Sequence, residues 1–250
     1  MAKTEKKQHR FGLIGKNISY SFSRGYFTEK FKNLGLDNYS YENFDFQKIE
    51  EFKPLIVNNT NIHGFNVTIP YKESIIPFLD ELHPKAKKIG AVNTIKFSKD
   101  KLIGYNTDAY GFQKAIEPHI KKRHKKALIL GTGGASKAVN YVLEEMGMEC
   151  IFISRSPKKN QFSYIDLTEE IISKYLVIVN CTPLGTHPDI ESKPDVPYQY
   201  VTKKHLLFDL IYNPEKTAFL ASGEKFGAKI CNGQTMLEHQ AEEAWSIWNS

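Results

Sequence analysis

Cysteine is scarce in this sequence, and long apolar runs are absent. The 250 residues include three cysteines, Cys150, Cys181 and Cys231, which stand far apart and without metal-ligand spacing. Such an odd and scattered set argues against a disulfide framework. No apolar run approaches the roughly 20 residues that cross a bilayer. Residues 11–15, behind the charged N-terminus, are too few for a signal core. We therefore expect a cytoplasmic protein with no metal and no membrane partner.

The remaining composition is that of an ordinary globular protein. Hydrophobic residues make up 41% and charged residues 25%, and the length fits one large or two modest domains. The net charge is +6, with basic clusters at Lys3, Lys6 and Lys7 and at 121–126. No aromatic residues are interleaved with these clusters, so we interpret them as a solvated tail and loop and expect no nucleic-acid partner. A positive net charge also suits an enzyme whose ligands are anions.

The most informative segment is 64–72, Gly-Phe-Asn-Val-Thr-Ile-Pro-Tyr-Lys. It begins like a β-strand, and alternate side chains of a strand share one face. We therefore expect Asn66 and Thr68 to point to one side, with Val67 and Ile69 packed on the other. An edge strand with solvated polar residues is the alternative interpretation.

An amine and a carboxylate accompany this strand. Pro70 stops the ladder and leaves Lys72 near the strand's end, where sites on open sheets lie. Asp108 stands at the expected start of a helix. There it is either a cap residue or a partner for Lys72 in acid–base chemistry, with an ordinary salt bridge as the plainer alternative.

Strand and helix signals alternate along the first part of the chain. Hydrophobic periodicity and glycine or proline punctuation place the boundaries. We predict strands at 11–14, 39–44 and 62–69, a hairpin at 92–97 and 102–105, and helices at 24–34, 46–57, 72–79 and 106–116.

A second series of βα units begins at Lys126. Residues 127–130 form a continuous apolar run, typical of a parallel strand buried on both faces. Alternating units of this kind predict an α/β protein with parallel sheets. We predict strands at 127–130, 150–153, 176–179, 206–210 and 229–231, and helices at 135–146, 217–223 and 235–248.

A glycine-rich turn joins the first strand and helix of this series. In 131–136, Gly131 permits the tight turn and Gly133 lets the backbone approach a pyrophosphate at the helix N-terminus. The third position of the usual fingerprint is Ser136. A βα turn without a ligand is the alternative, but strand, glycines and helix occur in the order that a dinucleotide site requires.

The end of the next strand indicates which dinucleotide is used. NAD-binding sites carry an acidic residue there for the ribose hydroxyls. This chain has Ser154, Arg155 and Ser156, followed by Lys158 and Lys159. A guanidinium fork, hydroxyls and ammonium groups attract a 2′-phosphate. The segment therefore predicts NADP, with a basic surface turn as the alternative.

Other polar clusters lie at expected strand and helix ends. Ser19, Ser21 and Ser23 form a row of hydroxyls suited to a polyol or carboxylate, although Ser23 also fits a helix N-cap. A plain polar loop is the alternative at each of the remaining clusters, which are 90–94 with Asn93, 180–185, 209–214 with Tyr212, and 232–237 followed by Gln240.

Together these motifs resemble the shikimate dehydrogenase family, from Gly12 to Trp248. The resemblance implies an α/β protein with an N-terminal substrate domain, residues 1–108 joined by the C-terminal helix 235–250. Residues 109–234 would form a Rossmann-type, doubly wound parallel-sheet domain for NADP. It also implies NADPH-dependent reduction of 3-dehydroshikimate to shikimate, on the route to aromatic amino acids, by a monomer or homodimer.

The resemblance also implies a role for individual residues. Lys72 and Asp108 match the catalytic pair and also contact substrate. The other substrate-binding positions are Ser21, Ser23, Asn66, Thr68, Asn93, Tyr212 and Gln240. The NADP-binding positions are Gly131, Thr132, Gly133, Gly134, Ala135, Ser154, Arg155, Ser156, Lys159, Leu210 and Gly233. The chain departs from the family pattern at Asn17, Tyr20, Arg24, Ser154 and Thr186.

Two alternative functions remain open. A quinate or quinate/shikimate dehydrogenase differs in recognising one more ring hydroxyl, and a single hydroxyl contact can change discrimination by orders of magnitude. A non-catalytic sensor of shikimate or NADP would be favoured by loss of Lys72 or Asp108, and both are present.

Overall fold

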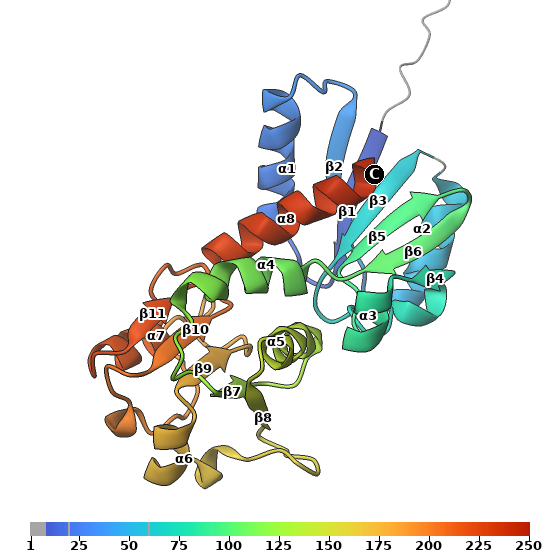
Figure 1. Ribbon diagram of the computed structural model, residues 1–250. Helices are drawn as coiled ribbons and strands as arrows, with labels where there is room; N and C mark the ends of the chain where they lie inside the picture. Colours follow the sequence, from blue (N-terminus) through green and yellow to red (C-terminus); the bar gives the residue numbers. More distant parts are fainter. Residues whose placement is uncertain (1–8, 20, 60) are drawn as a thin grey trace, which may run out of the picture. The chain divides into compact units, whose positions relative to one another are not determined.

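The computed structural model describes residues 9–19, 21–59 and 61–250, so Lys3, Lys6, Lys7 and Tyr20 lie outside the described residues. The chain divides into two compact units, each with its own sheet (Figure 1). Unit 1 comprises Met1–Thr107 and Ala241–Ser250, and unit 2 comprises Asp108–Gln240. The second boundary falls inside helix α8 (Gln234–Asn249).

Unit 1 is built on a mixed six-stranded sheet with the order β2-β1-β3-β5-β6-β4. Strands β1, β2 and β3 are parallel, whereas β5 pairs antiparallel with β3 and β6, which confirms the predicted hairpin. The strands are β1 (His9–Gly15), β2 (Tyr39–Asp45), β3 (Ile62–Val67), β4 (Glu81–Leu82), β5 (Thr94–Ser98) and β6 (Lys101–Tyr105). The helices of this unit are α1 (Phe22–Asn33), α2 (Phe52–Asn58) and α3 (Pro84–Ile89).

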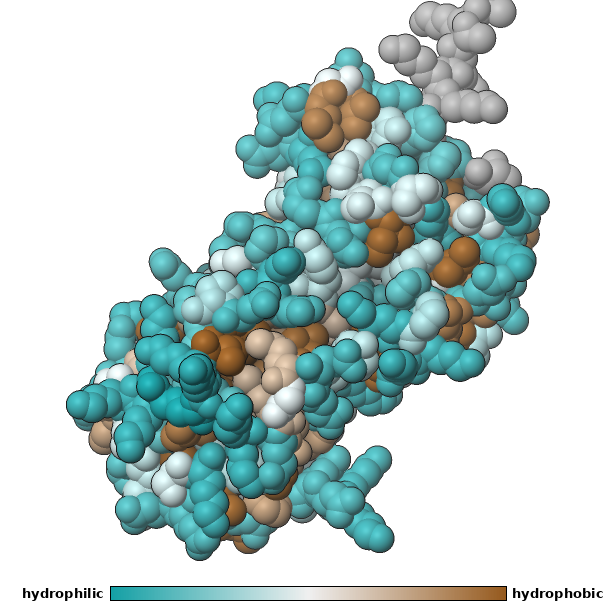
Figure 2. Space-filling view, viewed as in Figure 1, coloured by the Kyte–Doolittle hydropathy of each residue, from teal (hydrophilic) through white to brown (hydrophobic). Residues whose placement is uncertain are grey.

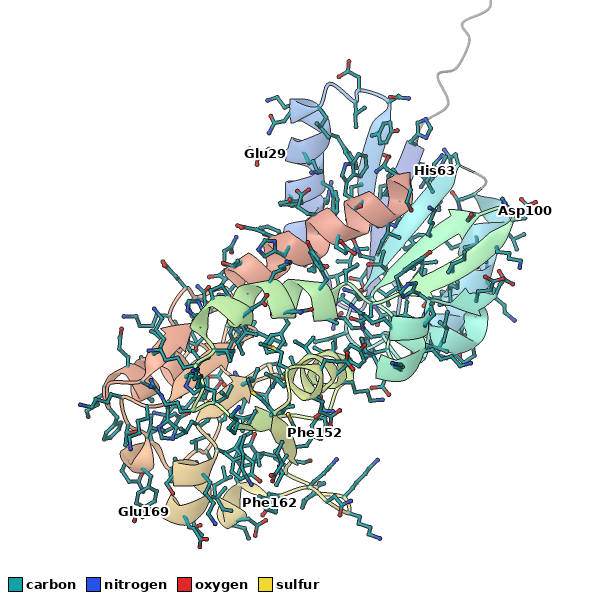
Figure 3. All side chains as sticks on the ribbon, viewed as in Figure 1. Glu29, His63, Asp100, Phe152, Phe162 and Glu169 are labelled. Atoms are coloured by element: carbon teal, nitrogen blue, oxygen red, sulfur yellow. The ribbon has the colours of Figure 1, made fainter. Side chains whose placement is uncertain are left out.

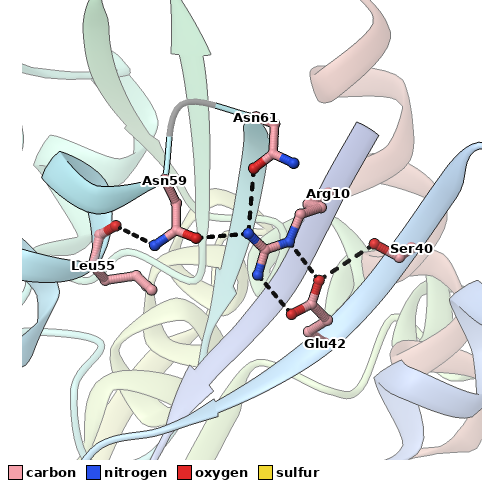
Figure 4. Close-up of polar contacts among 6 residues, drawn as sticks. All are labelled: Arg10, Ser40, Glu42, Leu55, Asn59 and Asn61. Carbon is pink, nitrogen blue, oxygen red and sulfur yellow. Dashed lines mark hydrogen bonds and ion pairs between the residues drawn. The ribbon is translucent and has the colours of Figure 1, made fainter. Parts of the chain in front are cut away.

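Arg10 joins three segments of this sheet (Figure 4). Its guanidinium donates to both carboxylate oxygens of Glu42 on β2, at 2.6 and 2.8 Å. The same group donates to Asn59 and Asn61, which precede β3, at 2.6 and 3.2 Å. A bidentate pair supported by two amides has a defined geometry, so it aligns β1 with both neighbours.

Trp248 anchors the C-terminal end of α8 on unit 1. Its ring packs among the buried rings of Phe11, Phe27 and Tyr41. Its indole Nε1 donates to the backbone oxygen of Ile95 at 3.0 Å. The ring lies so close to the backbone of β3 that a β-carbon at Gly64 would overlap it.

Two expectations for the segment after β3 are wrong. Residues 70–75 form turns, and the predicted helix at 72–79 is reduced to a short 3₁₀ turn, Ile76–Phe78. Pro77 explains this, because proline in a helix interior lacks an N–H and clashes with the preceding turn. Ile69 is 68% exposed instead of packed, because β3 ends at Val67 and the alternation of the strand ends with it.

Unit 2 is a parallel five-stranded sheet with the order β11-β10-β9-β7-β8. The rings of Phe112 on α4 and Phe208 on β10 lie 5.1 Å apart, whereas Ile172 on α6 and Phe219 on α7 pack with Leu128. Phe208 is in register with Val179 and Ile129, so Phe208 and Leu128 point to opposite faces of the sheet. Helices therefore cover both faces, which confirms the doubly wound class.

The strands of unit 2 are β7 (Lys126–Leu130), β8 (Glu149–Ile153), β9 (Val177–Asn180), β10 (Leu206–Asp209) and β11 (Lys229–Cys231). Its helices are α4 (Asp108–Ile116), α5 (Gly134–Glu145), α6 (Glu169–Lys174) and α7 (Ala218–Glu224). Elements α3, α6 and β4 were not predicted because each is too short to show a clear period.

The visible surface is mainly hydrophilic, with hydrophobic residues in small separate patches (Figure 2). Within the described part of the chain, no helix combines the length and apolarity of a membrane span.

A buried histidine closes the turn before β7. The backbone N–H of His124 donates to Lys121 O at 2.8 Å, and its ring Nδ1 accepts from Lys121 N at 3.2 Å. The ring Nε2 lies 3.2 Å from Lys204 O, a carbonyl that only accepts. These partners require a neutral imidazole with its proton on Nε2.

The turn before β10 repeats this arrangement. The backbone N–H of His205 donates to Thr202 O at 2.9 Å, and ring Nδ1 accepts from Thr202 N at 3.0 Å. Ring Nε2 donates to Ile172 O at 3.0 Å. Both rings therefore close turns at the amino-terminal edge of the sheet and do so in the neutral form.

Acid should weaken unit 2 through these two rings. Burial lowers the pKa of His124 and of His205 below the ordinary value. The unfolded chain therefore takes up protons first as the pH falls through about 6.5, and the free energy of unfolding decreases, by at most about 1.4 kcal/mol per pH unit for each ring. Urea unfolding at pH 7.5 and 5.5 measures the loss, which should be smaller in a His124→Gln/His205→Gln variant. Equal losses in both proteins would contradict this assignment.

A methyl group at Gly64 should displace Trp248. We expect Gly64→Ala to lower the free energy of unfolding by at least about 2 kcal/mol, through overpacking and loss of the hydrogen bond to Ile95. Gly25→Ala is the matched control, because a β-carbon on this exposed position of α1 meets nothing within 4 Å. Alanine should stabilise that helix slightly. Equal stability of the two variants would show that the ring moves without cost.

Candidate active site

Asn66 is held in one orientation by its neighbours in unit 1. It is only 4% exposed and pairs in register with Thr94 across β3 and β5. Tyr41 Oη donates to Asn66 Oδ1 at 2.7 Å, and Asn66 Nδ2 donates to Thr94 Oγ1 at 3.2 Å. Neither Tyr41 nor Thr94 was predicted as a site residue, because nothing in the sequence places either residue beside Asn66.

Asn93 is fixed in the same way. Its Oδ1 accepts from Thr107 N at 2.7 Å, and its Nδ2 donates to Thr107 Oγ1 at 3.0 Å. Asn106, one residue earlier, donates to the backbone oxygen of Ala91 at 2.9 Å. These bonds hold the segment that leads into α4 against the loop before β5. Thr94 Oγ1 also donates to Asn93 Oδ1 at 3.2 Å, which links Asn93 to Asn66 in one hydrogen-bond network.

The two serines of the first motif lie at the start of α1. The sequence allowed Ser23 as the N-cap, but the cap is Ser21, whose Oγ accepts from Ser23 N at 3.2 Å. Ser23 is buried. Arg24 is exposed on the helix, and Asn17 takes a positive φ of 56° in the preceding turn.

Lys72 and Asp108 occupy different local structures. Lys72 lies half-buried in the turn after β3, and its backbone oxygen accepts from Val92 N at 2.7 Å, next to Asn93. Thr68, just past the end of β3, donates its backbone N–H to Ile14 O. Asp108 is buried and is the first residue of α4.

The glycine-rich turn of unit 2 has the geometry that a phosphate-binding loop requires. Gly131 has a φ of +102°, where a side chain would be strained, and Gly133 faces open space at the N-cap of α5. Ser136 is buried and donates its hydroxyl to Gly133 O at 2.7 Å. The serine therefore closes the turn in place of the third glycine. Thr132, Gly134 and Ala135 belong to the same turn and the first residues of α5.

The basic turn 154–161 follows β8 directly. At its base, where Figure 3 labels Phe152 and Phe162, Phe162 N donates to Phe152 O at 3.0 Å and Ser154 N donates to Phe162 O at 2.9 Å. Ser154 Oγ accepts from Ser156 N at 3.2 Å. The side chains of Arg155, Ser156 and Lys159 are exposed. Within the described ranges, no carboxylate forms an ion pair with Arg155 or Lys159. Both cations are thus available for a ligand, and the residues fit the 2′-phosphate of NADP.

Three further predicted residues gather at the carboxyl ends of β9 and β10. Leu210 N donates to Asn180 O, and Gly233 N donates to Ile211 O, both at 3.0 Å. A β-carbon on Gly233 would overlap the carbonyl of Leu210, so only glycine permits this approach. Tyr212 follows in the same loop, half-buried. Gln240 lies elsewhere in unit 2, on α8, where its Nε2 donates to Leu237 O.

The cysteines have no catalytic environment. All three are free thiols, and burial raises the pKa of Cys150 to about 12 and that of Cys181 well above its ordinary value. Thiolates are the reactive form, so these thiols are poor nucleophiles. Among the described residues, no group of three or more His, Cys, Asp or Glu side chains is arranged to hold a metal ion.

A glycine-rich βα turn on a doubly wound sheet, followed by a basic turn, defines the class of NADP-binding oxidoreductases. The family model for the shikimate dehydrogenase substrate binding domain matches residues 13–95. A curated shikimate dehydrogenase (NADP(+)) from Caldicellulosiruptor saccharolyticus is 38% identical over 94% of this chain and 90% of its own. One from Clostridium botulinum is 40% identical over 95% of each chain.

Solved structures agree with these relatives. A shikimate dehydrogenase in complex with NADP+ has a TM-score of 0.87 at 36% identity, covering 97% of this chain and 90% of that one. The enzyme of Thermus thermophilus in complex with NADP(H) and shikimate has a TM-score of 0.84 at 31% identity, with 96% and 92% covered. The chain therefore belongs to the shikimate dehydrogenase family, which confirms the resemblance seen in the sequence.

Proposed function

We propose that this chain is a shikimate dehydrogenase that reversibly reduces 3-dehydroshikimate to shikimate with NADPH, on the route to chorismate and the aromatic amino acids. The supporting observation is that the rigid amide network around Asn66 and Asn93 and the basic turn 154–161 occur in one chain. The first suits a ring with several hydroxyls, and the second suits a 2′-phosphate. Asn66, Asn93 and residues 154–159 also match the motif pattern of the family.

Substrate recognition is assigned to the residues that match the family's substrate-binding positions. Ser21 and Ser23 bind the carboxylate as hydroxyl donors. Asn66, Thr68, Asn93 and Gln240 bind ring hydroxyls, and Tyr212 is assigned a place near the carboxylate. Because Tyr41, Thr94 and Thr107 already engage the amides of Asn66 and Asn93, these groups meet the substrate without first losing rotamer freedom.

Cofactor binding is assigned to residues 109–234. The turn at Gly131–Ala135 cradles the pyrophosphate, and Ser154, Arg155, Ser156 and Lys159 bind the 2′-phosphate. Leu210 and Gly233 also contact the cofactor. When bound, NADPH supplies the hydride that the ketone carbon receives.

Lys72 and Asp108 carry the proton transfer. Reduction places a hydride on the carbonyl carbon and a proton on its oxygen, and the Lys72 ammonium donates that proton. In the reverse direction the neutral amine of Lys72 accepts the proton from the alcohol. Asp108 is the second residue of the catalytic pair, and it also binds a substrate hydroxyl. A cytoplasmic location and a monomeric or homodimeric state complete the proposal.

Shikimate and quinate, each offered with NADP and with NAD, test the function by absorbance of the reduced nicotinamide. We expect shikimate with NADP to be the best pair by a wide margin. Faster oxidation of quinate would instead favour the quinate dehydrogenase alternative. If neither shikimate nor quinate led to reduced nicotinamide, a non-catalytic sensor would be favoured.

Arg155 should determine cofactor choice. Charge-assisted hydrogen bonds to phosphate are strong. We expect Arg155→Ala to raise the KM for NADP at least about tenfold, which corresponds to about 1.4 kcal/mol, and to change the KM for NAD less than about twofold. NAD is the internal control, since it lacks the phosphate. Equal increases for both cofactors would mean that Arg155 shapes the turn and does not bind the phosphate.

Lys72 should be needed for turnover more than for binding. Loss of a positioned acid–base group costs about 10²–10⁴ in rate, so we expect Lys72→Ala to lower kcat by that factor with a smaller change in shikimate affinity. Lys87→Ala, on the exposed side of α3 in the same unit, is the matched control and should turn over normally. A near-normal kcat in Lys72→Ala would show that the proton comes from another source, such as Asp108 or water.

A further inference from the structure

Asp209 is a buried carboxylate that no part of the proposed mechanism uses. It ends β10 with 0% of its surface exposed. Its Oδ1 accepts from Asn180 Nδ2 at 3.0 Å and from Ile211 N at 3.1 Å, and its Oδ2 accepts from Thr217 Oγ1 at 2.6 Å. Among the described residues, no lysine or arginine forms an ion pair with it. Burial raises the pKa of Asp209 to about 6, against the opposing effect of these three hydrogen bonds.

The first partner connects Asp209 to the glycine-rich turn. Asn180 is itself fully buried, and its Oδ1 accepts from both the backbone N and the Oγ1 of Thr182, at 3.0 and 2.7 Å. The methyl group of Thr182 and the carbonyl of Cys181 then pack against Gly131, 3.3 Å from the position that a β-carbon would take. The Asn180 amide thus helps to position Cys181 and Thr182, the residues that pack against Gly131 in the glycine-rich turn.

The other two partners connect Asp209 to the loop after β10. Thr217 is fully buried and caps α7, since its Oγ1 accepts from Leu220 N at 3.3 Å. Ile211 donates its N–H to Asp209 and accepts at its carbonyl from Gly233 N. The carboxylate therefore holds both ends of the loop that carries Leu210 and Tyr212.

Three donors from three segments converge on this one side chain. Only a group with two acceptor oxygens satisfies them together. Removal of the carboxylate would leave buried donors unsatisfied, and such groups shift until they find water or another acceptor. The loops that follow β9 and β10 would then no longer be held together by a shared hydrogen-bond acceptor.

We propose that Asp209 is a positioning residue for NADP, which it serves by locking the loops after β9 and β10 against the glycine-rich turn. This inference rests on the proposed function, in which the glycine-rich turn and Leu210 bind the cofactor. It predicts that the side chain matters for cofactor affinity without touching the cofactor.

Direct titration of NADPH, followed by its fluorescence, tests the inference without relying on turnover. We expect Asp209→Ala to raise the NADPH Kd about tenfold, and Asp209→Asn, which keeps the oxygen that accepts from Asn180 and Ile211, to recover most of the affinity. Thr217→Val should also raise the Kd, whereas Thr217→Ser, which keeps the hydroxyl, should stay within about twofold of the wild type. In steady-state assays the KM for NADP should change more than kcat. If Asp209→Ala does not fold, the comparison of Thr217→Val with Thr217→Ser tests the inference on its own.

Thr168→Val is the matched control for a purely structural effect. Thr168 caps α6 in the same unit and accepts from Ile171 N, but it has no bond to Asp209. This variant should lose thermal stability and keep the wild-type Kd. Asp209→Ala and Thr217→Val variants that are less stable but bind NADPH as the wild type does would overturn the inference. A wild-type protein that does not prefer NADPH to NADH would instead refute the proposed function itself.

Discussion

The hydrogen bond from Tyr41 to Asn66 illustrates the constraint on which both candidate sites depend. Polar groups buried away from water must find partners within the protein, because an unsatisfied donor or acceptor is costly. In unit 1 this requirement links Tyr41 to Asn66, and through Thr94 to Asn93 and Thr107. The amides that recognise substrate in our proposal are therefore parts of the core as well as of the site.

The same constraint acts at the carboxyl edge of the unit 2 sheet. Asp209, Asn180 and Thr217 are completely buried and satisfy one another across two strands and a helix cap. Parallel strands end at one edge, so loops that are distant in sequence meet there. A buried polar network at that edge converts flexible loops into a surface of defined shape, which is what a cofactor site needs.

Rigidity of this kind has a functional consequence. Groups that are already oriented lose little conformational entropy when a ligand binds. The Gly131 turn and the Leu210–Gly233 contact are both so tight that a side chain at either glycine would be strained or would overlap the backbone. In contrast, the side chains of Arg155 and Lys159 are exposed on the turn after β8. Unit 2 thus combines rigid backbone contacts with exposed cationic side chains, and the latter suit a phosphate.

The sequence by itself determined the α/β class, the order of most strands and helices, and the family with its NADP preference. Those features depend on local patterns, such as the apolar run 127–130, the glycines that follow it and the missing acid after β8. Tertiary structure decided the rest. β3 ends early and leaves Ile69 exposed, and the N-cap of α1 is Ser21 and not Ser23. The expected helix at 72–79, in contrast, is excluded by Pro77, a residue already visible in the sequence. The partners of Asn66, Asn93 and Asp209 come from other strands and loops, and a local pattern carries no information about which distant donors will meet a buried acceptor.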